Sequence, residues 1–193
     1  MKKTLLRVLF ALTLSGSVIS MSGCVPIVAG GIGAGILMAE DRRTSGTYVM
    51  DEEIELKIAS RIRENFGENA HVNVTSFNRR VLLTGQVPDA AARLKVEDIS
   101  KELANVRNVQ NELVIGNVLN FGGRTNDSYI TTKVKARFME EKRFTAYHVK
   151  VVTEATTVFL MGLVKREEGN AAAEVAARTS GVSKVVKVFE YMD

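Results

Sequence analysis

The residue with the clearest chemistry is Cys24, the only cysteine in the 193-residue chain. It directly follows Ser22 and Gly23, and upstream lies an apolar run at 8–19 that only small polar residues interrupt. Three basic residues precede that run: Lys2, Lys3 and Arg7. This order is typical of a secretory signal peptide over residues 1–23. The run is too short to span a bilayer, which takes about 20 apolar residues.

The sequence around Cys24 is similar to the bacterial lipobox, in which the cysteine thiol is acylated and becomes the first residue after cleavage. Met21 stands where leucine is commoner. The alternative is an ordinary signal peptide with an incidental cysteine, but a lone thiol in an exported protein needs an explanation. We therefore expect lipidation of Cys24 and a mature chain of 170 residues. Two or three acyl chains would hold this chain stably at a bilayer.

The other reactive side chains form no catalytic constellation in the sequence. The two histidines, His71 and His148, occupy equivalent places in an internal repeat, which favours a shared structural role over catalysis or metal binding. Carboxylates are interspersed with Lys and Arg, as on solvated helix faces. Gly85 and Gly162 end strand-like motifs that no phosphate-binding pattern follows, so tight packing or a turn is expected there. We expect no enzyme, no metal and no cofactor apart from the covalent lipid.

Composition and charge limit the partners of the mature chain. The formal net charge of +4 falls to near +1 once the three signal-peptide cations are removed. We therefore expect no nucleic-acid partner, and no small-molecule substrate is indicated. Hydrophobic residues make up 46% of the chain, enough to build one medium domain or two small ones.

A lipidated segment and linker, residues 24–50, precede the first repeat. The part from Val25 to Met38 reads VPIVAGGIGAGILM and is apolar and rich in glycine, which weakens both helix and strand. We expect it to lie at the lipid interface or on a partner; the alternative is a disordered apolar tether. Residues 40–48 turn polar and indicate a linker.

Two stretches of the mature chain repeat each other. Asp51 begins DEEIELKIASRI, and Asp127, 76 residues later, begins DSYITTKVKARF. Two further phrases follow in the same order: HVNV at 71 with HVKV at 148, and VLLTGQV at 81 with VFLMGLV at 158. The repeat predicts two domains, at 51–116 and 127–193, with a linker at 117–126.

Each copy carries the same expected elements. Ile54, Ile58 and Ile62 recur every four residues, which predicts an amphipathic helix with acidic residues 51–53 at its start. Alternating residues at 72–74 and 81–85 predict two strands with a turn at 77–79. A second helix is expected from 88 to 103, with Leu94, Ile99 and Leu103 on or near its buried side, and a last strand at 109–115. The order is αββαβ, an α+β fold with a small three-stranded mixed sheet covered by two helices.

This pattern resembles the BON domain, a bacterial module often found in periplasmic proteins. The helix stripe, V-x-V, V-x-L-x-G-x-V and the closing V-x-x-V carry the resemblance. Together with the lipobox and the glycine-rich stretch, two such domains resemble a group of dual BON-domain outer-membrane lipoproteins. That resemblance implies anionic phospholipid binding through the first helix of the second domain, a role in outer-membrane integrity, and gathering at cell division sites.

The two repeats differ in charge. The first has nine Lys and Arg against eleven Asp and Glu, whereas the second has eleven against nine. In the first helix of the second repeat, Tyr129, Lys133 and Arg137 share a stripe, beside an apolar stripe of Ile130, Val134 and Phe138 assigned to the core. An aromatic ring beside cations suits a headgroup interface, although an ordinary solvated helix face is the plain alternative. The resembled group usually has Trp where Tyr129 stands, so weaker binding is expected.

These observations lead to a set of expectations about function. The protein is expected to be lipid-anchored in the outer membrane and to face the periplasm, since Val25 replaces the Asp that retains lipoproteins in the inner membrane of enteric bacteria. Its expected partner is an anionic phospholipid membrane, with envelope proteins as further partners. The alternative is a protein-interaction adaptor anchored only by its acyl chains. The expected phospholipid-binding residues are Tyr129, Ile130, Lys133 and Arg137.

Overall fold

The computed structural model describes residues 41–116 and 121–193. Cys24, its lipidation and the apolar segment 25–38 lie outside the described residues, as do residues 117–120. Within the described part of the chain, no helix combines the length and the apolar character that crossing a membrane requires.

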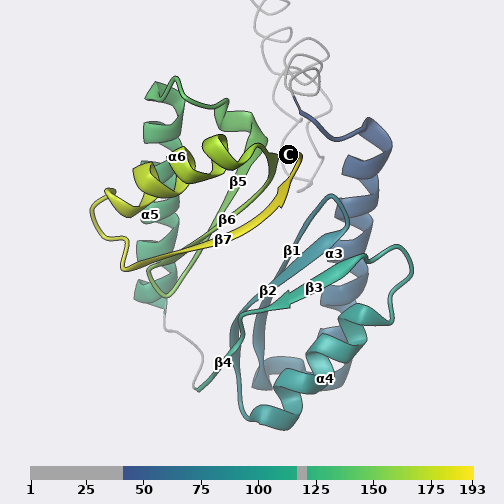
Figure 1. The fold of residues 1–193 in the computed structure, drawn as a ribbon. Coiled ribbons are helices and arrows are strands. Elements are labelled where there is room, and N and C mark those ends of the chain that lie inside the picture. Colours follow the sequence, from purple (N-terminus) through teal and green to yellow (C-terminus); the bar gives the residue numbers. More distant parts are fainter. Residues whose placement is uncertain (1–40, 117–120) are drawn as a thin grey trace, which may run out of the picture. The chain divides into compact units, whose positions relative to one another are not determined.

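Domain 1 is a mixed sheet with two helices, α3 (Ser45–Phe66) and α4 (Ala90–Lys101) (Figure 1). A short 3₁₀ turn, η1 (Gly67–Asn69), leads from α3 into the sheet. Strand β1 (His71–Phe77) pairs antiparallel with β2 (Arg80–Val87), and β2 pairs in parallel with β3 (Asn108–Asn111) and β4 (Val114–Ile115). The strand predicted at 109–115 is thus broken into two short pieces.

Domain 2 repeats this order with α5 (Phe121–Glu140) and α6 (Arg166–Ala177). After the 3₁₀ turn η2 (Ala146–His148), strand β5 (Val149–Glu154) pairs antiparallel with β6 (Thr157–Val164), which pairs in parallel with β7 (Lys184–Tyr191). The predicted α+β fold of two αββαβ units is confirmed. Helix α5 already begins at Phe121, inside the linker expected at 117–126.

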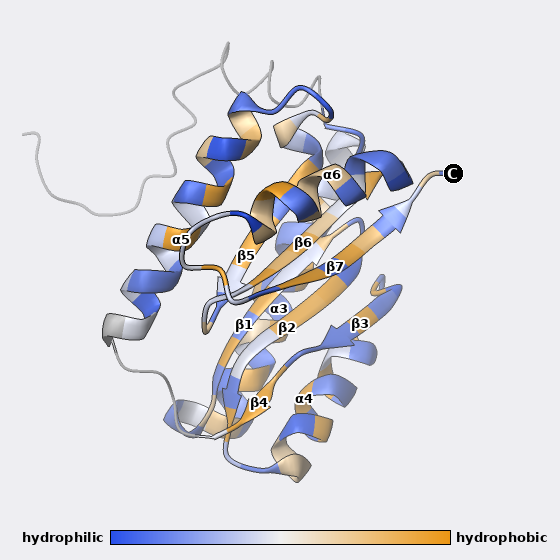
Figure 2. Cartoon of the chain, turned by 60° about the vertical axis from the view of Figure 1, so that its left-hand side comes forward, coloured by the Kyte–Doolittle hydropathy of each residue, from blue (hydrophilic) through white to orange (hydrophobic). Residues whose placement is uncertain are grey.

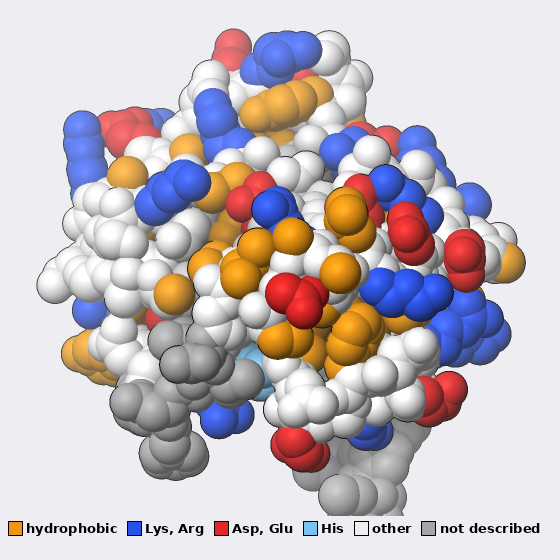
Figure 3. Space-filling view, turned by 90° about the horizontal axis from the view of Figure 1, so that it is seen from below, with side chains coloured by type: hydrophobic (Ala, Val, Ile, Leu, Met, Phe, Trp, Pro, Cys, Tyr) orange, Lys and Arg blue, Asp and Glu red, His pale blue; other side chains and the backbone are white. Residues whose placement is uncertain are grey.

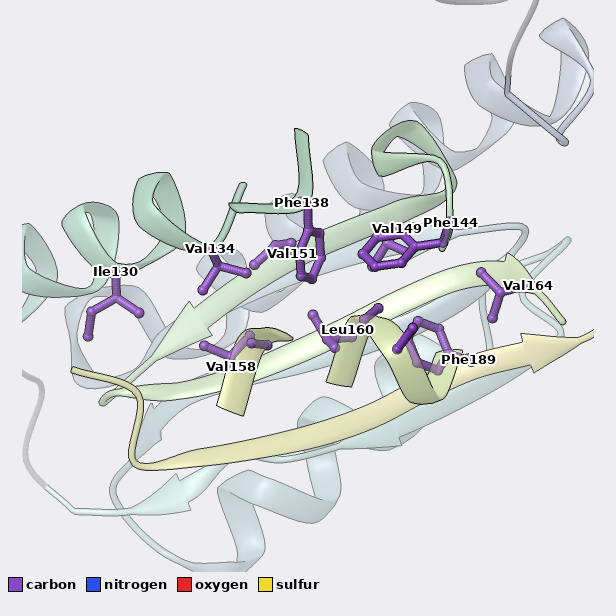
Figure 4. Packing of buried hydrophobic residues seen from close by; sticks show 13 residues of the cluster. Ile130, Val134, Phe138, Phe144, Val149, Val151, Val158, Leu160, Val164 and Phe189 are labelled. Atoms are coloured by element: carbon purple, nitrogen blue, oxygen red, sulfur yellow. The ribbon is translucent and has the colours of Figure 1, made fainter. Parts of the chain in front are cut away.

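The predicted apolar stripes form the two helix-covered cores. Ile54, Ile58 and Ile62 on α3 are at most 5% exposed. Ile130, Val134 and Phe138 on α5 point toward Val151, Val158 and Leu160 of the sheet (Figure 4). In α4, Ala92, Val96 and Ile99 face the core, so the assignment of Leu94 to the buried side is wrong: it is 63% exposed. Leu103 is buried as predicted.

A buried aspartate on each first helix holds the turn of the following hairpin. Asp51 accepts backbone hydrogen bonds from Asn78 (2.8 Å) and Arg79 (2.7 Å), both at positive φ. Asp127 accepts the equivalent bonds from Ala155 and Thr156, both 2.8 Å. These turns have the left-handed residues that tight hairpins need.

The acidic residues 51–53 therefore do not begin a helix, as the sequence analysis expected. Helix α3 starts at Ser45, and the Thr44 side chain caps it by accepting from the Thr47 amide. Asp51 lies in the helix interior, where its carboxylate serves the turn and not the helix dipole.

The repeated glycines and histidines meet in pairs. A Cβ on Gly85 would lie 2.0 Å from the His71 carbonyl oxygen, and one on Gly162 would lie 2.3 Å from that of His148. Both glycines therefore permit a close approach of two backbone segments, which agrees with the tight packing predicted for them. Each histidine contributes a backbone atom to its pair.

Residues 41–116 and 121–193 belong to one compact unit, in which the two sheets pack on each other. Phe77 and Leu82 form a buried cluster with Phe159, Met161 and Val188. Strands β2 and β6 are largely hydrophobic along their length (Figure 2). Both of their faces are buried, one under helices and the other against the opposite sheet.

Two arginines hold the chain segment before α3. Arg42 pairs through both terminal nitrogens with the carboxylate of Glu168 on α6, at 2.6 and 2.7 Å, and also donates to the Leu163 carbonyl. Arg43 pairs with Asp41 and Asp51 and lies 4.0 Å from the centroid of the Phe77 ring. The segment 40–48 expected to be a linker is thus bound to both domains, and its last four residues already belong to α3.

Alanine at either repeated glycine is expected to destabilise the fold. Gly85→Ala and Gly162→Ala should each lower the free energy of unfolding by about 2 kcal/mol or more, because backbone must move to admit the methyl group. Urea unfolding followed by circular dichroism measures this. Gly116→Ala is the matched control, since nothing lies within 4 Å of its added Cβ. Equal stability of all three variants would contradict the packing argument.

The Arg42–Glu168 pair is expected to make stability pH-dependent. Hydrogen bonds from Arg42 hold the pKa of Glu168 at about 2, below its ordinary value of 4.5. The pair therefore stabilises the fold above pH 4.5, and this contribution is lost as the pH falls toward 2. Arg42→Gln should cost about 2 kcal/mol at pH 7 and progressively less below pH 4.5. In a Glu168→Gln background the pH dependence of that cost should disappear, and its persistence there would refute the assignment.

Candidate functional site

The outer face of α5 combines exposed apolar side chains with cations. Tyr129 is 62% exposed and Met139 is 60% exposed. They are ten residues apart, so they lie about 15 Å apart along the helix and about 80° apart around it. Lys133 and Arg137 lie on the Tyr129 side of this face, and Lys135 lies on the Met139 side by the same spacing. A flat surface could therefore meet both apolar residues with cations on either flank.

Lys133 and Arg137 also have a structural role that the sequence did not predict. Lys133 Nζ donates to the Ser180 carbonyl and lies 4.5 Å from the centroid of the Tyr129 ring. Arg137 donates to the Arg178 carbonyl at 2.5 Å and to Thr179 Oγ1 at 3.4 Å. Both cations thus approach the C-terminal end of α6, where the partial charge of a helix is negative. Both tie α5 to the end of α6, and Lys133 also packs on the Tyr129 ring.

Ile130 was expected among the phospholipid-binding residues, and the structure contradicts this. Its side chain is 0% exposed and packs in the domain 2 core with Val134 and Phe138. It adjoins Tyr129 in sequence, but consecutive helix residues point about 100° apart. Ile130 therefore positions the helix and does not reach a surface.

The sequence analysis missed Met139 as a member of this face. The signal was present: Met139 falls outside the 130–134–138 stripe, so its helical phase places it away from the core. Lys135 was counted among the cations but not assigned to the site. It is exposed, and among residues 41–116 and 121–193 we find no hydrogen bond or ion pair of its side chain.

Part of the expected positive charge beyond α5 is neutralised. Arg143 pairs with Glu141 at 2.7 Å and with Glu174 at 2.8 Å. Hydrogen bonds from Arg143 lower the pKa of Glu141 to about 2. Between Tyr129 and the end of α5, the cations that remain are therefore Lys133, Lys135 and Arg137.

The described residues offer little for catalysis. No group of three or more His, Cys, Asp or Glu among them could hold a metal ion. His71 begins β1 and His148 ends η2, and each sets its carbonyl against a glycine. The chemistry available on α5 is the binding of an anionic, partly apolar surface.

The structural role of the paired cations predicts unequal effects of alanine along α5. Lys133→Ala and Arg137→Ala should each lower the free energy of unfolding by about 1 kcal/mol, through lost bonds to the carbonyls that follow α6. Lys135→Ala should change it by less than about 0.5 kcal/mol. Chemical denaturation of the three variants is the measurement. A cost for Lys135→Ala as large as for the other two would show that this division is wrong.

Comparison with known proteins agrees with the two-domain fold. The sequence matches the BON domain family at residues 51–117 and again at 126–193. It is 39% identical over 182 residues to the outer membrane lipoprotein DolP of Haemophilus influenzae, covering 93% of this chain and 94% of that protein. It is 36% identical over 154 residues to a 21 kDa hemolysin of Actinobacillus pleuropneumoniae, covering 79% of each.

Among solved structures, the C-terminal domain of CdsD, a type III secretion protein of Chlamydia trachomatis, aligns with 72% of this chain and 96% of its own. The sequence identity is 9% and the TM-score 0.30, so no argument rests on it. The two family matches together cover most of the chain, and the DolP relative spans nearly its whole length. The chain therefore belongs to the non-enzymatic BON domain family and carries two copies of that domain.

Proposed function

We propose that this protein is an outer-membrane lipoprotein that binds anionic phospholipid through α5 of its second BON domain. Its acyl chains on Cys24 anchor it facing the periplasm. The naming of the Haemophilus relative as an outer membrane lipoprotein supports the location, as does Val25 after the lipidated cysteine. By binding anionic phospholipid it supports outer-membrane integrity and gathers at division sites, where such lipid is enriched.

The observation that carries this proposal is the outer face of α5. Tyr129 and Met139 supply apolar contacts at the depth of the headgroups, where aromatic residues are favoured. Lys133, Lys135 and Arg137 meet phosphates from both flanks of that face. An interfacial helix combines these same two kinds of residue.

The strength of such binding is modest without the anchor. Each cation near an anionic surface contributes about 1 kcal/mol, so three cations together raise the affinity about a hundredfold. That alone leaves the α5 contact weak. The acyl chains on Cys24 keep the helix near the bilayer and so raise its effective concentration at the surface.

Vesicle flotation tests this proposal. The mature chain with Cys24→Ser should float with vesicles containing phosphatidylglycerol and much less with neutral ones. Tyr129→Glu and Lys135→Glu should each lower the affinity for anionic vesicles about fivefold or more. Lys135→Glu is more informative than reversal at Lys133 or Arg137, because those substitutions would also loosen α6.

The matched control lies on domain 1. Leu94→Glu changes a helix residue that is 63% exposed, about the same as Tyr129, and should leave flotation unchanged. Equal flotation with neutral and anionic vesicles would overturn the proposal. So would a loss with Leu94→Glu as large as with Tyr129→Glu.

A second candidate, an adaptor that binds envelope proteins, rests on a separate surface. Leu94 on α4 and Val114 and Ile115 on β4 are all more than half exposed. On the face seen from below, hydrophobic side chains intermingle with basic and acidic ones (Figure 3). Such a mixture suits a protein partner better than an anionic bilayer. One stoichiometric partner that is lost with Leu94→Glu, in a protein without vesicle binding, would favour this function.

A further inference from the structure

An apolar groove lies beside the proposed membrane-binding helix. It has a volume of about 480 Å³, within the range of ligand pockets. One wall is the N-terminal part of α3 and the other is the C-terminal part of α5, with β1, β5 and η2 between them. Its apolar surface comes from Tyr48, Phe77, Phe138, Met139, Tyr147 and Val151.

Four polar side chains in the wall of this groove already have partners. Ser76 Oγ donates to Asp51 at 2.7 Å, and Arg43 pairs with Asp51 at 2.9 Å. Lys150 pairs with Glu55 at 2.9 Å and also donates to the Ser76 carbonyl. An occupant would gain little from side chains that are already bound and would mainly contact the apolar ones. The groove is therefore suited to hydrocarbon.

Two charged residues of the lining remain at the exposed rim, Lys135 on α5 and Glu52 on α3. A phosphate on an occupant would be drawn to Lys135 and repelled by Glu52, so its headgroup belongs on the α5 side. Lys135 and Met139 also border the outer face of α5. The groove is thus continuous with the surface that the proposed function places against the bilayer.

We propose that this groove takes up one acyl chain of an anionic phospholipid while Lys135 binds its phosphate. This inference rests on the proposed function, since the bilayer that α5 meets supplies the lipid. The chain leaves the bilayer interior and buries its methylenes against Phe77, Tyr147 and Val151. The α5 contact thereby becomes recognition of a single lipid in addition to attraction by a charged surface.

Photo-crosslinking in vesicles tests this with the wild-type acylated protein. Phosphatidylglycerol with a diazirine at the end of one acyl chain should label groove residues such as Tyr48, Phe77 and Tyr147. The same lipid with the diazirine on its headgroup should label α5 near Lys135 and leave the groove floor unlabelled. Acyl-chain labels confined to α5's outer face and to residues 25–38 would overturn the proposal.

A groove-filling variant separates this inference from the proposed function. Ala146→Trp places an indole in the groove and should lower acyl-chain labelling there at least about fivefold, while flotation stays within about twofold. Ala91→Trp, on an exposed α4 position beside a different surface hollow, is the control and should change neither. Thermal melting checks that both variants fold. If Ala146→Trp does not fold, the labelling pattern of the wild-type protein alone tests the groove.

The outcomes are distinct. Flotation of the wild type without acyl-chain labels in the groove would refute the groove and leave the proposed function intact. Undiminished groove labelling in folded Ala146→Trp would refute the groove as the binding place. Failure of the wild type to float would refute the proposed function and this inference with it.

Discussion

The fold depends on covering both faces of two small sheets. Each sheet has a central strand, β2 or β6, that is buried almost from end to end. Two helices cover one face of each sheet. The chain has a single cysteine, so no internal disulfide can stabilise these domains, and domains of this size bury too little surface to leave the other face in water. The sheets therefore cover each other, and Phe77, Leu82, Phe159, Met161 and Val188 form a third core between the domains.

Polar bonds at the edges of that third core fix how the sheets meet. Buried Glu154 accepts from Asn73 at 2.9 Å and from Gln86 at 2.7 Å. The ion pair of Glu55 with Lys150 also crosses between the domains. An apolar interface alone specifies position poorly, whereas a buried carboxylate left without donors would be costly. Part of the positive charge of the second repeat is therefore paired with the first repeat, through Lys150 and Glu55, and is not available to a membrane.

What could be predicted from the sequence was local, and what could not depended on distant contacts. The stripes of α3 and α5 followed from spacing along one helix. The function of Asp51 could not be predicted in this way, because its partners Asn78 and Arg79 lie 27 and 28 residues away. The runs VLLTGQV and VFLMGLV carried a neglected signal: strands buried on both faces have near-continuous hydrophobic sequences. Such sequences predict that a second layer covers the outer face of each sheet, as the sheet-on-sheet packing does.

The candidate site followed the same division. The exposure of Tyr129 could be predicted from its helical phase. The burial of Ile130 could be predicted in the same way, although Ile130 was named among the expected phospholipid-binding residues. The bonds of Lys133 and Arg137 to the end of α6 could not, because the loop after α6 lies more than forty residues further along the chain.

The structural bonds of these cations are compatible with binding phosphate. A lysine has three donors and an arginine five, so contacts to the Ser180 and Arg178 carbonyls leave donors that can face outward. The same contacts restrict the side chains before any lipid arrives, which reduces the conformational entropy lost on binding. Lys135 differs because its side chain has no such bond among the described residues, so an anion bound there would have to order it. The α5 surface thus joins two fixed cations, one of which packs on Tyr129, to one adaptable cation at the mouth of the apolar groove.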